Sequence, residues 1–421
     1  MTTPGDYCRK SQRYLKTLCN VRPNRRTGSP GNREATDFFA DTIRAYGYEV
    51  DATPFECLDY ISDGSVLTRG EEVFEVYVSP YSLGCDVLAD LIVVSTVEEL
   101  ESTNCEGKIL LMRGAICSEQ LMPKGFVFYN PEHHRRTIAL LESRKPAAII
   151  TATERKPEQV GALYPFPLIV DGDFDIPSVY CRDTVGDVLA AMQGALFRLK
   201  VKAMRVLSSA ANVVARLNVG AAKKVVITAH IDAYEDTPGA SDNASGVVVL
   251  LLVGEMLSDY GGENCVEIAA LNGEDHYSAA GQMDYLKRYG DELGQVLLVA
   301  NVDDVGYKEG RSSYSFYECP AQLERTAEDV FQRFDGLVRG EPWFSGDHMI
   351  FVQSGVPCVA FTTECMPALM STVTHTSSDT PDIIDCHKLV EVAAAEAEED
   401  ALDRLRSGEP VEVANTASAE G

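Results

Sequence analysis

The sequence has no run of about 18 consecutive apolar residues, the length that a membrane-spanning helix requires. Basic residues are scarce, because 37 Lys and Arg stand against 64 Asp and Glu and give a formal net charge of −27. Proteins that bind nucleic acids carry basic surfaces, so neither a membrane nor a nucleic acid is expected as a partner. The same acidity favours cationic ligands such as metal ions and free amines.

The 12 cysteines are scattered along the chain and form no C-x-x-C pair. This spacing argues against a zinc site made of thiolates and against a disulfide framework. The N-terminal segment is basic but lacks the apolar core of a secretory signal. We therefore expect reduced, mostly buried thiols in a cytoplasmic protein.

The length of 421 residues predicts two or three domains, in a chain whose 45% apolar and 24% charged residues are typical of folded proteins. From about residue 210 onward, strand-like and helical patterns alternate, which predicts an α/β fold with a mixed, mostly parallel sheet between layers of helices. Residues 63–206 instead show short apolar runs separated by turns. We expect one domain made of 1–62 and 207–407, an inserted β-rich domain at 63–206, and an acidic disordered tail at 408–421.

The individual elements of the first domain can be predicted from the apolar pattern. The predicted strands are 212–218, 224–230, 266–271, 295–302 and 356–362, and the predicted helices are 32–46, 243–259, 279–289, 323–334 and 387–406. Because the carboxyl ends of parallel strands meet at one edge of a sheet, functional side chains are expected to gather there.

Polar residues follow these strands where they end. They are His230 and Asp232, then Asp242 at the start of a helix, the pair Glu274-Asp275, Asp303 and, beyond the last strand, His375. Imidazole and carboxylate without thiolate suit zinc and, less exclusively, cobalt or manganese. So many carboxylates at one edge would repel one another without a counter-ion, although an acidic rim that binds nothing is the alternative.

The adjacent carboxylates Glu274 and Asp275 indicate catalysis as well as binding. Neighbouring side chains on an extended segment point in opposite directions, so one can bind a metal while the other faces a substrate. A carboxylate beside a metal-activated water is suited to act as a general base. The residue types alone leave open which of the two has which role.

The order and spacing of these residues resemble the two-zinc exopeptidases of metallopeptidase family 28, which include bacterial leucyl aminopeptidases, aminopeptidase Y and glutamate carboxypeptidase. The matching segments are His230-Ile231-Asp232, Gly239-Ala240-Ser241-Asp242-Asn243-Ala244-Ser245-Gly246, Glu274-Asp275, Asn301-Val302-Asp303-Asp304-Val305-Gly306, Ser345-Gly346-Asp347-His348 and His375-Thr376-Ser377-Ser378-Asp379-Thr380. The resemblance covers about 1–60 and 208–405. It implies the phosphorylase/hydrolase-like fold of zinc exopeptidases.

The resemblance also implies which residues bind two zinc ions. His230 and Asp303 would bind one zinc. Asp275 and His375 would bind the other. Asp242 would bind both, and a hydroxide shared by the two metals would attack the peptide carbonyl.

Further roles follow from the same resemblance. Glu274 would be the general base that takes the proton of the attacking water. Asp232 and Asp379 would orient the two histidines, with helix or turn capping as the alternative. The peptide bond between Asp242 and Asn243 would be cis, as it often is in this family.

The inserted domain resembles the protease-associated domain that many family-28 peptidases carry. Residues 104–114 match its G-K-I-x-L-x-x-R-G strand, and residues 147–150 and 176–179 match later strands. The resemblance implies a lid or size filter beside the active site.

One departure from the family pattern concerns the oxyanion. Thr374 precedes His375 where related enzymes often have a tyrosine that donates a hydrogen bond to the oxyanion. Zinc or another tyrosine must then take this role, and the candidates are Tyr234, Tyr307 and Tyr317.

Several other polar and aromatic residues have two interpretations. Asp347 and His348 either line the pocket or are structural, and His133, His134 and His276 are expected to be surface or hydrogen-bonded histidines and not ligands. The aromatic residues Trp343, Phe344 and Phe361 either wall an apolar pocket or pack in the core.

The leading hypothesis is an aminopeptidase whose partners are peptides with a free N-terminus. A carboxypeptidase or dipeptidase of the same family is the first alternative, but Arg311, Arg333 and Arg339 form no tight cluster that would bind carboxylates. A glutaminyl cyclase dispenses with the first histidine, so His230 argues against it. A binding scaffold that lost its activity would lack metal ligands, which are all present here. The preferred N-terminal residue and the oligomeric state stay open.

Overall fold

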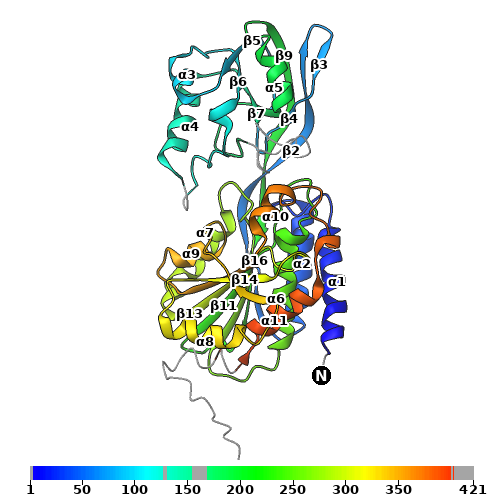
Figure 1. Ribbon diagram of the computed structural model, residues 1–421, viewed down its shortest axis with the longest axis vertical. Coiled ribbons are helices and arrows are strands. Elements are labelled where there is room, and N and C mark those ends of the chain that lie inside the picture. Colours follow the sequence, from blue (N-terminus) through cyan, green and yellow to red (C-terminus); the bar gives the residue numbers. More distant parts are fainter. Residues whose placement is uncertain (1–2, 127–129, 154–167, 400–401, 403–421) are drawn as a thin grey trace, which may run out of the picture.

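The computed structural model describes residues 3–126, 130–153, 168–399 and 402, and it contains two eight-stranded sheets placed end to end along the molecule (Figure 1). We call the part around the first sheet the lower domain. The part from the start of β2 to the end of β9, residues 54–211, is called the upper module. The expected tail at 408–421 lies outside the described residues.

The lower sheet has the strand order β1-β10-β12-β11-β13-β16-β14-β15. Its strands are β1 Glu49–Asp51, β10 Val213–Leu217, β11 Lys224–His230, β12 Cys265–Leu271, β13 Val296–Val302, β14 Ser312–Tyr317, β15 Leu337–Arg339 and β16 Cys358–Thr363. The four central strands β12, β11, β13 and β16 are parallel, whereas β1, β10 and β14 pair antiparallel with their neighbours toward the centre. The expected α/β fold with a mixed sheet is confirmed.

Helices cover both faces of this sheet. They are α1 Pro4–Cys19, α2 Pro30–Arg44, α6 Ser245–Met256, α7 Ala280–Tyr289, α8 Ala321–Phe331, α9 His348–Val352, α10 Met366–Thr372 and α11 Cys386–Glu396, with short turns of helix at Ala240–Ala244, Gly290–Gln295 and Pro381–Ile383. Val225 and Ile227 of β11 face α1, α2, α6, α8 and α11, and Val226 between them faces α7 and α9. This alternation is why the strand is apolar at consecutive positions.

The second helix shows how local sequence sets the bounds of an element. The Ser29 side chain accepts a hydrogen bond from the Asn32 N–H and caps the helix, so α2 starts at Pro30, two residues before the predicted start. Gly47 beyond its end has a φ of 93°, a conformation that favours glycine.

The last helix is shorter than expected. The pattern predicts a helix over 387–406, but α11 ends at Glu396, and the Ala397 N–H closes it on the carbonyl of Ala393. Of the remaining predicted positions, 400–401 and 403–406 lie outside the described residues. Glu396, Glu398 and Glu399 lie at its carboxyl end, where the helix dipole disfavours negative charge.

The upper module has its own sheet, in the order β3-β2-β9-β5-β6-β7-β8-β4. Its elements are β2 Pro54–Arg69, β3 Glu72–Phe74, β4 Tyr77–Val78, β5 Cys85–Val94, α3 Val97–Ser102, β6 Ile109–Met112, a short turn of helix at Gly114–Cys117, α4 Glu132–Arg144, β7 Ala148–Thr153, β8 Ser178–Arg182, α5 Asp183–Ala190 and β9 Leu196–Ala211. A separate apolar core lies on each face of the sheet.

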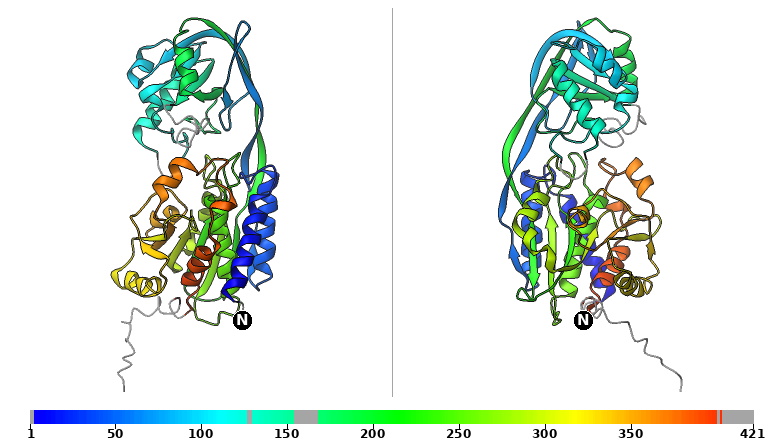
Figure 2. Two further views of the ribbon diagram at one scale, coloured as in Figure 1. Left: turned by 45° about the vertical axis from the view of Figure 1, so that its right-hand side comes forward. Right: turned by 90° about the vertical axis from the view of Figure 1, so that its left-hand side faces the viewer.

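The long strands β2 and β9 join the two parts, as both views of Figure 2 show. They pair antiparallel from Pro54 and Ala211 to Thr68 and Arg198, with one irregularity between Ser62 and Ser65. The expected domain boundaries at 62/63 and 206/207 fall within these two strands.

Two expectations about the whole chain can be compared with the structure. All 12 cysteines are free thiols and most are buried, as the scattered spacing predicts. None of the helices in the described part of the chain has the length and apolar character needed to cross a membrane.

Candidate metal centre

The described residues enclose a cavity of about 470 Å³ at the carboxyl ends of the parallel strands. His230, Asp242, Asp275, Asp303 and His375 all line it, together with Glu274. Residues of the upper module form part of its wall, which we call the roof: Gln120, Met122, Pro123, Phe126 and Val170. The edge predicted from the strand ends is therefore a site enclosed by both parts of the protein.

The first group of potential ligands surrounds His230. This imidazole ends β11, and its Nε2 lies 3.1 Å from Asp242 Oδ1 and 3.4 Å from Asp303 Oδ1. Asp303 directly follows β13, the neighbour of β11 in the sheet. All three residues are buried, and one atom of each lies within 4.8 Å of the others, so they could hold one cation together.

The second group surrounds His375, beyond α10. Its Nε2 lies 2.9 Å from Asp242 Oδ2 and 3.0 Å from Asp275 Oδ1. Asp242 thus directs one carboxylate oxygen to each histidine. The two groups share this residue, which is the arrangement that two neighbouring cations with one bridging carboxylate require.

The loop before α6 holds Asp242 in this position. The peptide bond between Asp242 and Asn243 is cis, as predicted. The Asn243 side chain donates to the Val302 carbonyl and accepts a hydrogen bond from the Gly246 N–H. These bonds tie the loop to the end of β13, which carries Asp303.

Asp379 supports the same loop. It was expected to orient His375 or to cap a turn, and its two carboxylate oxygens accept hydrogen bonds from the backbone N–H groups of Ser241 and Asp242 at 2.7 and 3.1 Å. These bonds to backbone N–H groups correspond to the alternative role, in which Asp379 caps a turn. Burial raises the pKa of Asp379 to about 7.

Asp232 lies behind His230. Its Oδ1 is 3.7 Å from His230 Nδ1, and its Oδ2 accepts a hydrogen bond of 2.8 Å from the Thr27 hydroxyl. The carboxylate is fully buried. A carboxylate on the far side of a ligand imidazole fixes the orientation of the ring.

Glu274 is the nearest carboxylate outside the two groups. One of its oxygens lies within 4.8 Å of ligand atoms of His230 and Asp275. Burial raises the pKa of Glu274 well above its usual value, and the nearby Asp275, Asp303 and Asp347 add to the effect. A carboxyl group in this position is suited to hold a proton at neutral pH.

The electrostatics of the site indicate a missing positive charge. Burial raises the pKa of Asp275 to about 6 and also raises the pKa of Asp303. Burial alone would lower the pKa of His230 and His375, but the surrounding carboxylates outweigh it and raise both well above the usual value. The protein without metal therefore holds protons where two cations would supply the charge, and the donor set of imidazole and carboxylate fits zinc.

His276 is hydrogen-bonded, as expected, and so is His348, whose role the sequence left open between pocket and structure. His276 lines the cavity but its Nε2 lies 2.8 Å from the Leu58 carbonyl oxygen. His348 is buried, with Nε2 3.0 Å from the carbonyl oxygen of Trp343. His133 and His134 lie in the upper module beside Glu119, away from the two ligand groups.

For three aromatic residues, the sequence left open whether they line the pocket or pack in the core. Trp343 and Phe344 line the cavity. Phe361 does not, because it points to the opposite side of the sheet, where it packs against Phe331 and Tyr314 in the core.

Asp347 also lines the cavity. Its Oδ1 accepts a hydrogen bond of 2.7 Å from Gln282, and burial raises the pKa of Asp347 to about 7.

Sequence reasoning missed the residues that complete the site from a distance. These are Thr27 and the roof residues Gln120 and Met122, which lie far from the motifs along the chain, and Gln282, which lies seven positions after Asp275. Each is an ordinary polar or apolar residue with no spacing that distinguishes it. Only packing across the molecule brings them to the cavity.

Comparison with known proteins supports the sequence resemblance. Residues 212–399 match the model of Peptidase family M28. The probable lipoprotein aminopeptidase LpqL of Mycobacterium tuberculosis is 25% identical over 295 residues, which are 69% of this chain and 56% of that protein. The probable leucine aminopeptidase 2 of Arthroderma benhamiae is 23% identical over 379 residues, 82% of this chain and 70% of that protein. The match thus spans little more than half of the first relative.

Solved structures share the fold over nearly the whole chain. An aminopeptidase from Aneurinibacillus sp. strain AM-1 superposes with a TM-score of 0.74 at 23% identity, covering 96% of both chains. BSAP, a zinc aminopeptidase from Bacillus subtilis, gives a TM-score of 0.72 at 19% identity and covers 93% of this chain and 95% of its own. At these identities the likeness establishes the architecture alone.

Proposed function

Because residues 212–399 match the model of Peptidase family M28, we propose that this chain is a two-zinc aminopeptidase of that family that removes N-terminal residues from peptides. The observation that carries the proposal is the position of Asp242, whose two oxygens face His230 and His375. Known relatives named as aminopeptidases support the same activity.

Two sets of residues would hold the metals. His230 and Asp303 would bind one zinc, His375 and Asp275 the other, and Asp242 would bridge them. When bound, the two cations would polarise the peptide carbonyl and make a shared water nucleophilic at neutral pH. Cobalt or manganese could replace zinc at such ligands.

Glu274 would be the general base. Its carboxylate accepts the proton that the attacking water loses and then gives it to the nitrogen of the departing peptide amine. Without metal, burial and the nearby carboxylates raise the pKa of Glu274, but two bound cations would favour the ionised carboxylate that accepts this proton. Asp232, held by Thr27, would keep the His230 ring in its orientation.

The charge of the cavity favours a substrate with a free α-amine. Asp304 and Asp347 add carboxylates to its wall, and no Lys or Arg is among the described residues that line it. Arg311, Arg333 and Arg339 form ion pairs with glutamates elsewhere. A carboxypeptidase would need a cationic group to bind the C-terminal carboxylate, so the aminopeptidase is preferred.

The upper module would limit access to this site as a protease-associated-like lid. Its residues Met122, Pro123 and Phe126 form part of the cavity wall, so long or folded chains would be excluded. The cytoplasmic location stays a prediction, which fractionation of the source cell would test.

Metal analysis combined with anilide hydrolysis tests the proposed function. Wild type and Asp242→Asn are reconstituted with zinc, analysed for metal, and assayed on leucyl-, lysyl- and glutamyl-anilides, with N-acetyl-leucyl anilide as the blocked control. We expect about two zincs per chain, release of the unblocked amino acid only, and loss of both properties in the variant.

The other outcomes distinguish the alternatives. Failure to bind zinc, cobalt or manganese would contradict the catalytic proposal and leave a scaffold. Two bound metals without activity on any unblocked anilide would contradict the aminopeptidase and direct the assays to carboxypeptidase and dipeptide substrates.

A further inference from the structure

We propose that Arg25 is a positioning residue of the metal centre, because its guanidinium group holds both ends of the loop that links His230 to Asp242. We call residues 231–239 the ligand loop. This role rests on the proposed function, since it concerns the metal ligands of the same site. It also assigns a part in the metal centre to a residue outside 212–399, the range that matches the family model.

Arg25 lies between α1 and α2 and is buried. Its Nε donates a hydrogen bond of 3.1 Å to the carbonyl of Ile231, at the start of the ligand loop. Its Nη1 and Nη2 donate to the carbonyls of Pro238 and Gly239 at 2.6 and 2.7 Å, at the end of the loop. Nη1 also lies 3.2 Å from the Leu18 carbonyl oxygen at the end of α1. One planar group thus joins both ends of the ligand loop to the first helix.

The carbonyl of Gly239 extends this connection to Asp242. The same oxygen accepts a hydrogen bond of 3.0 Å from the Ala244 N–H, so it joins Arg25 to the turn that contains Asp242. Gly239 has a φ of 59°, and a Cβ at this position would lie 2.7 Å from Arg25 Nη2. Glycine therefore lets the backbone of the loop approach the guanidinium group closely.

The two residues that follow Arg25 contact the same loop. The Arg26 guanidinium lies 2.9 Å from the Glu235 carboxylate, and the Thr27 hydroxyl donates to Asp232 at 2.8 Å. Three consecutive side chains thus hold the ligand loop along its length. Of the three, Arg25 contacts the loop through its backbone, so it acts on the path of the chain between the two metal ligands.

The shape of the arginine side chain is essential to this role. A guanidinium group carries five N–H donors in a fixed plane, so it can bond to both ends of the loop at once, whereas a lysine carries the same charge on a single nitrogen. Buried carbonyl oxygens that lose their donor are costly, so the loop would shift to find others. A shift would change the 3.1 Å between His230 Nε2 and Asp242 Oδ1.

Zinc affinity is the first measurement, by competition with a chromophoric chelator on the full chain. Arg25→Lys should weaken zinc binding by about 10–100-fold, the usual loss when a group that orients metal ligands is changed. Arg205→Lys is the matched control. Arg205 is a mostly buried arginine of β9 that also donates to backbone carbonyls, those of Tyr81 and Phe174, and it does not line the cavity of the metal centre. Its variant should lose stability but keep the wild-type affinity for zinc.

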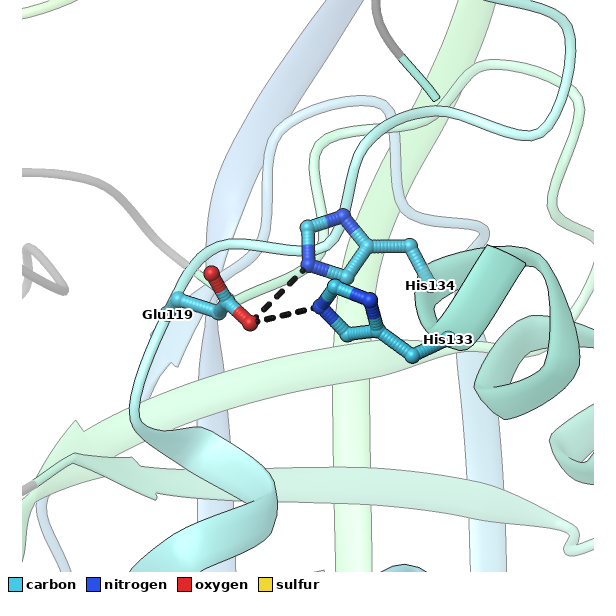
Figure 3. Close-up of side chains that lie close together, drawn as sticks. All are labelled: Glu119, His133 and His134. Carbon is cyan, nitrogen blue, oxygen red and sulfur yellow. Dashed lines mark hydrogen bonds and ion pairs between the residues drawn. The ribbon is translucent and has the colours of Figure 1, made fainter. Parts of the chain in front are cut away.

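A second group of possible ligands should not disturb this measurement. Figure 3 shows Glu119, His133 and His134 of the upper module, where one Glu119 oxygen lies 2.8 Å from His133 Nε2 and 3.2 Å from His134 Nε2. Because His134 Nδ1 accepts a hydrogen bond from the Met122 N–H, the hydrogen of the neutral ring sits on Nε2 and faces Glu119. A metal ion at this nitrogen would have to displace that hydrogen. His133→Ala should therefore bind zinc as the wild type does.

Cobalt absorption separates a positioning role from a merely structural one. Co²⁺ at such ligands has visible absorption bands that depend on the geometry of the donors around it. The bands of Arg25→Lys should differ from those of the wild type, because His230 and Asp242 would meet the metal in a changed arrangement. The bands of Arg205→Lys should be those of the wild type, even where urea denaturation shows the same loss of stability for both variants.

Rescue by a free guanidinium ion is the sharpest control. Arg25 lines a separate open cavity of about 410 Å³ together with Arg22 and Pro238, so the ion can enter the space that Arg25→Ala leaves. Guanidinium chloride, far below its denaturing concentration, should restore part of the zinc affinity of this variant. Ammonium chloride at the same concentration should not, because it lacks the planar set of donors. If Arg25→Ala does not fold, Arg25→Lys and its cobalt bands decide the question.

The outcomes distinguish this inference from the proposed function. Wild-type zinc affinity and cobalt bands in Arg25→Lys, or equal losses of affinity in Arg205→Lys, would overturn the positioning role. Equal rescue by ammonium would do the same. A wild type that binds no zinc, cobalt or manganese would refute the proposed function itself.

Discussion

The lower domain and the upper module are both built on eight-stranded sheets, but the long strands of the two sheets differ in how far their faces are buried. In the lower domain, β11 and β12 are buried at every residue, whereas β9 of the upper module alternates between buried and exposed positions along its first half. A strand covered on both faces is mostly apolar, so a cluster of polar residues just after its end is conspicuous. Where one face is open, polar residues are common and carry no such signal.

The same difference separates the chemistry of the two parts. The lower domain supplies the groups that would bind metal and move protons, all from strand ends and the loops that follow. The upper module contributes a roof from segment 119–126, whose anchors are hydrogen bonds to residues far along the chain. The groups that would bind metal and move protons thus come from the ends of strands, whereas the residues that would limit access to the cavity come from loops.

The strongest test of this division is a matched pair of cavity variants. Glu274→Gln should lower kcat by about 10²–10⁴-fold with zinc retained, because a glutamine cannot accept the proton. Met122→Ala, in the roof, should change KM while kcat and zinc content stay at the wild-type level. Steady-state kinetics with metal analysis measure both. A fall in kcat for Met122→Ala similar to that of Glu274→Gln would contradict the separation of chemistry from access.

Stability should depend on the joint between the two parts. Arg26 lies 2.9 Å from Glu235, donates to Asp59 at 2.8 Å, and stacks on Tyr60 with 3.8 Å between guanidinium and ring centre. Asp59 and Tyr60 belong to β2, and Glu235 follows β11. Arg26→Met leaves both carboxylates without their partner and should lower the free energy of unfolding by about 3 kcal/mol.

An exposed ion pair of the upper module is the control for this change. Arg198 donates two hydrogen bonds of 2.8 Å to Asp86, but about half of each side chain is exposed. Arg198→Met should therefore change the free energy of unfolding by about 0–1 kcal/mol. Urea denaturation measures both variants, and equal losses would show that the joint at Arg26 has no special weight.

Metal affinity should depend on support from behind the ligands. Asp232→Asn should weaken zinc binding by about 10–100-fold, because the amide orients His230 less well than the carboxylate does. Thr27→Val removes only the hydrogen bond to Asp232 and should have a smaller effect in the same direction. Competition with a chromophoric chelator measures both affinities. Wild-type affinity for Asp232→Asn would show that the ring of His230 is held by packing alone.

The last test concerns the pH dependence of the protein without metal. Burial raises the pKa of Asp347 from 3.8 to about 7, so the folded state keeps a proton that the unfolded state has released over this range. Its contribution to stability is present at low pH and is lost as the pH rises, by at most about 1.4 kcal/mol per pH unit.

Asp347→Asn removes this dependence. The stability of the variant relative to wild type should therefore increase as the pH is raised from about 4 to about 7. Thermal unfolding of both metal-free proteins over this range measures the difference. A constant difference would show that Asp347 is ionised in the folded protein throughout.

Many elements of the lower domain could be predicted, because the apolar patterns that mark them lie within short stretches of the sequence. Residues 224–230 were predicted as a strand and form β11 with the same bounds. β14 gave no such signal, because Ser312, Ser313 and Ser315 are polar yet buried between β15 and β16. Small hydroxyl residues become buried only when neighbouring strands cover them, which no window of sequence reveals.

The sequence by itself determined the identity and order of the candidate metal ligands, because all except His375 lie within a few residues of a strand or helix end that the apolar pattern marks, and His375 begins a matching motif. Tertiary structure alone decided that Asp242 faces both histidines and that Asp379 supports the loop of Asp242. Apart from the contact between Asp242 and His230, those contacts join residues more than 100 positions apart. They depend on how two sheets pack and how side chains share a closed space, and the spacing of residues along a chain does not encode such distances.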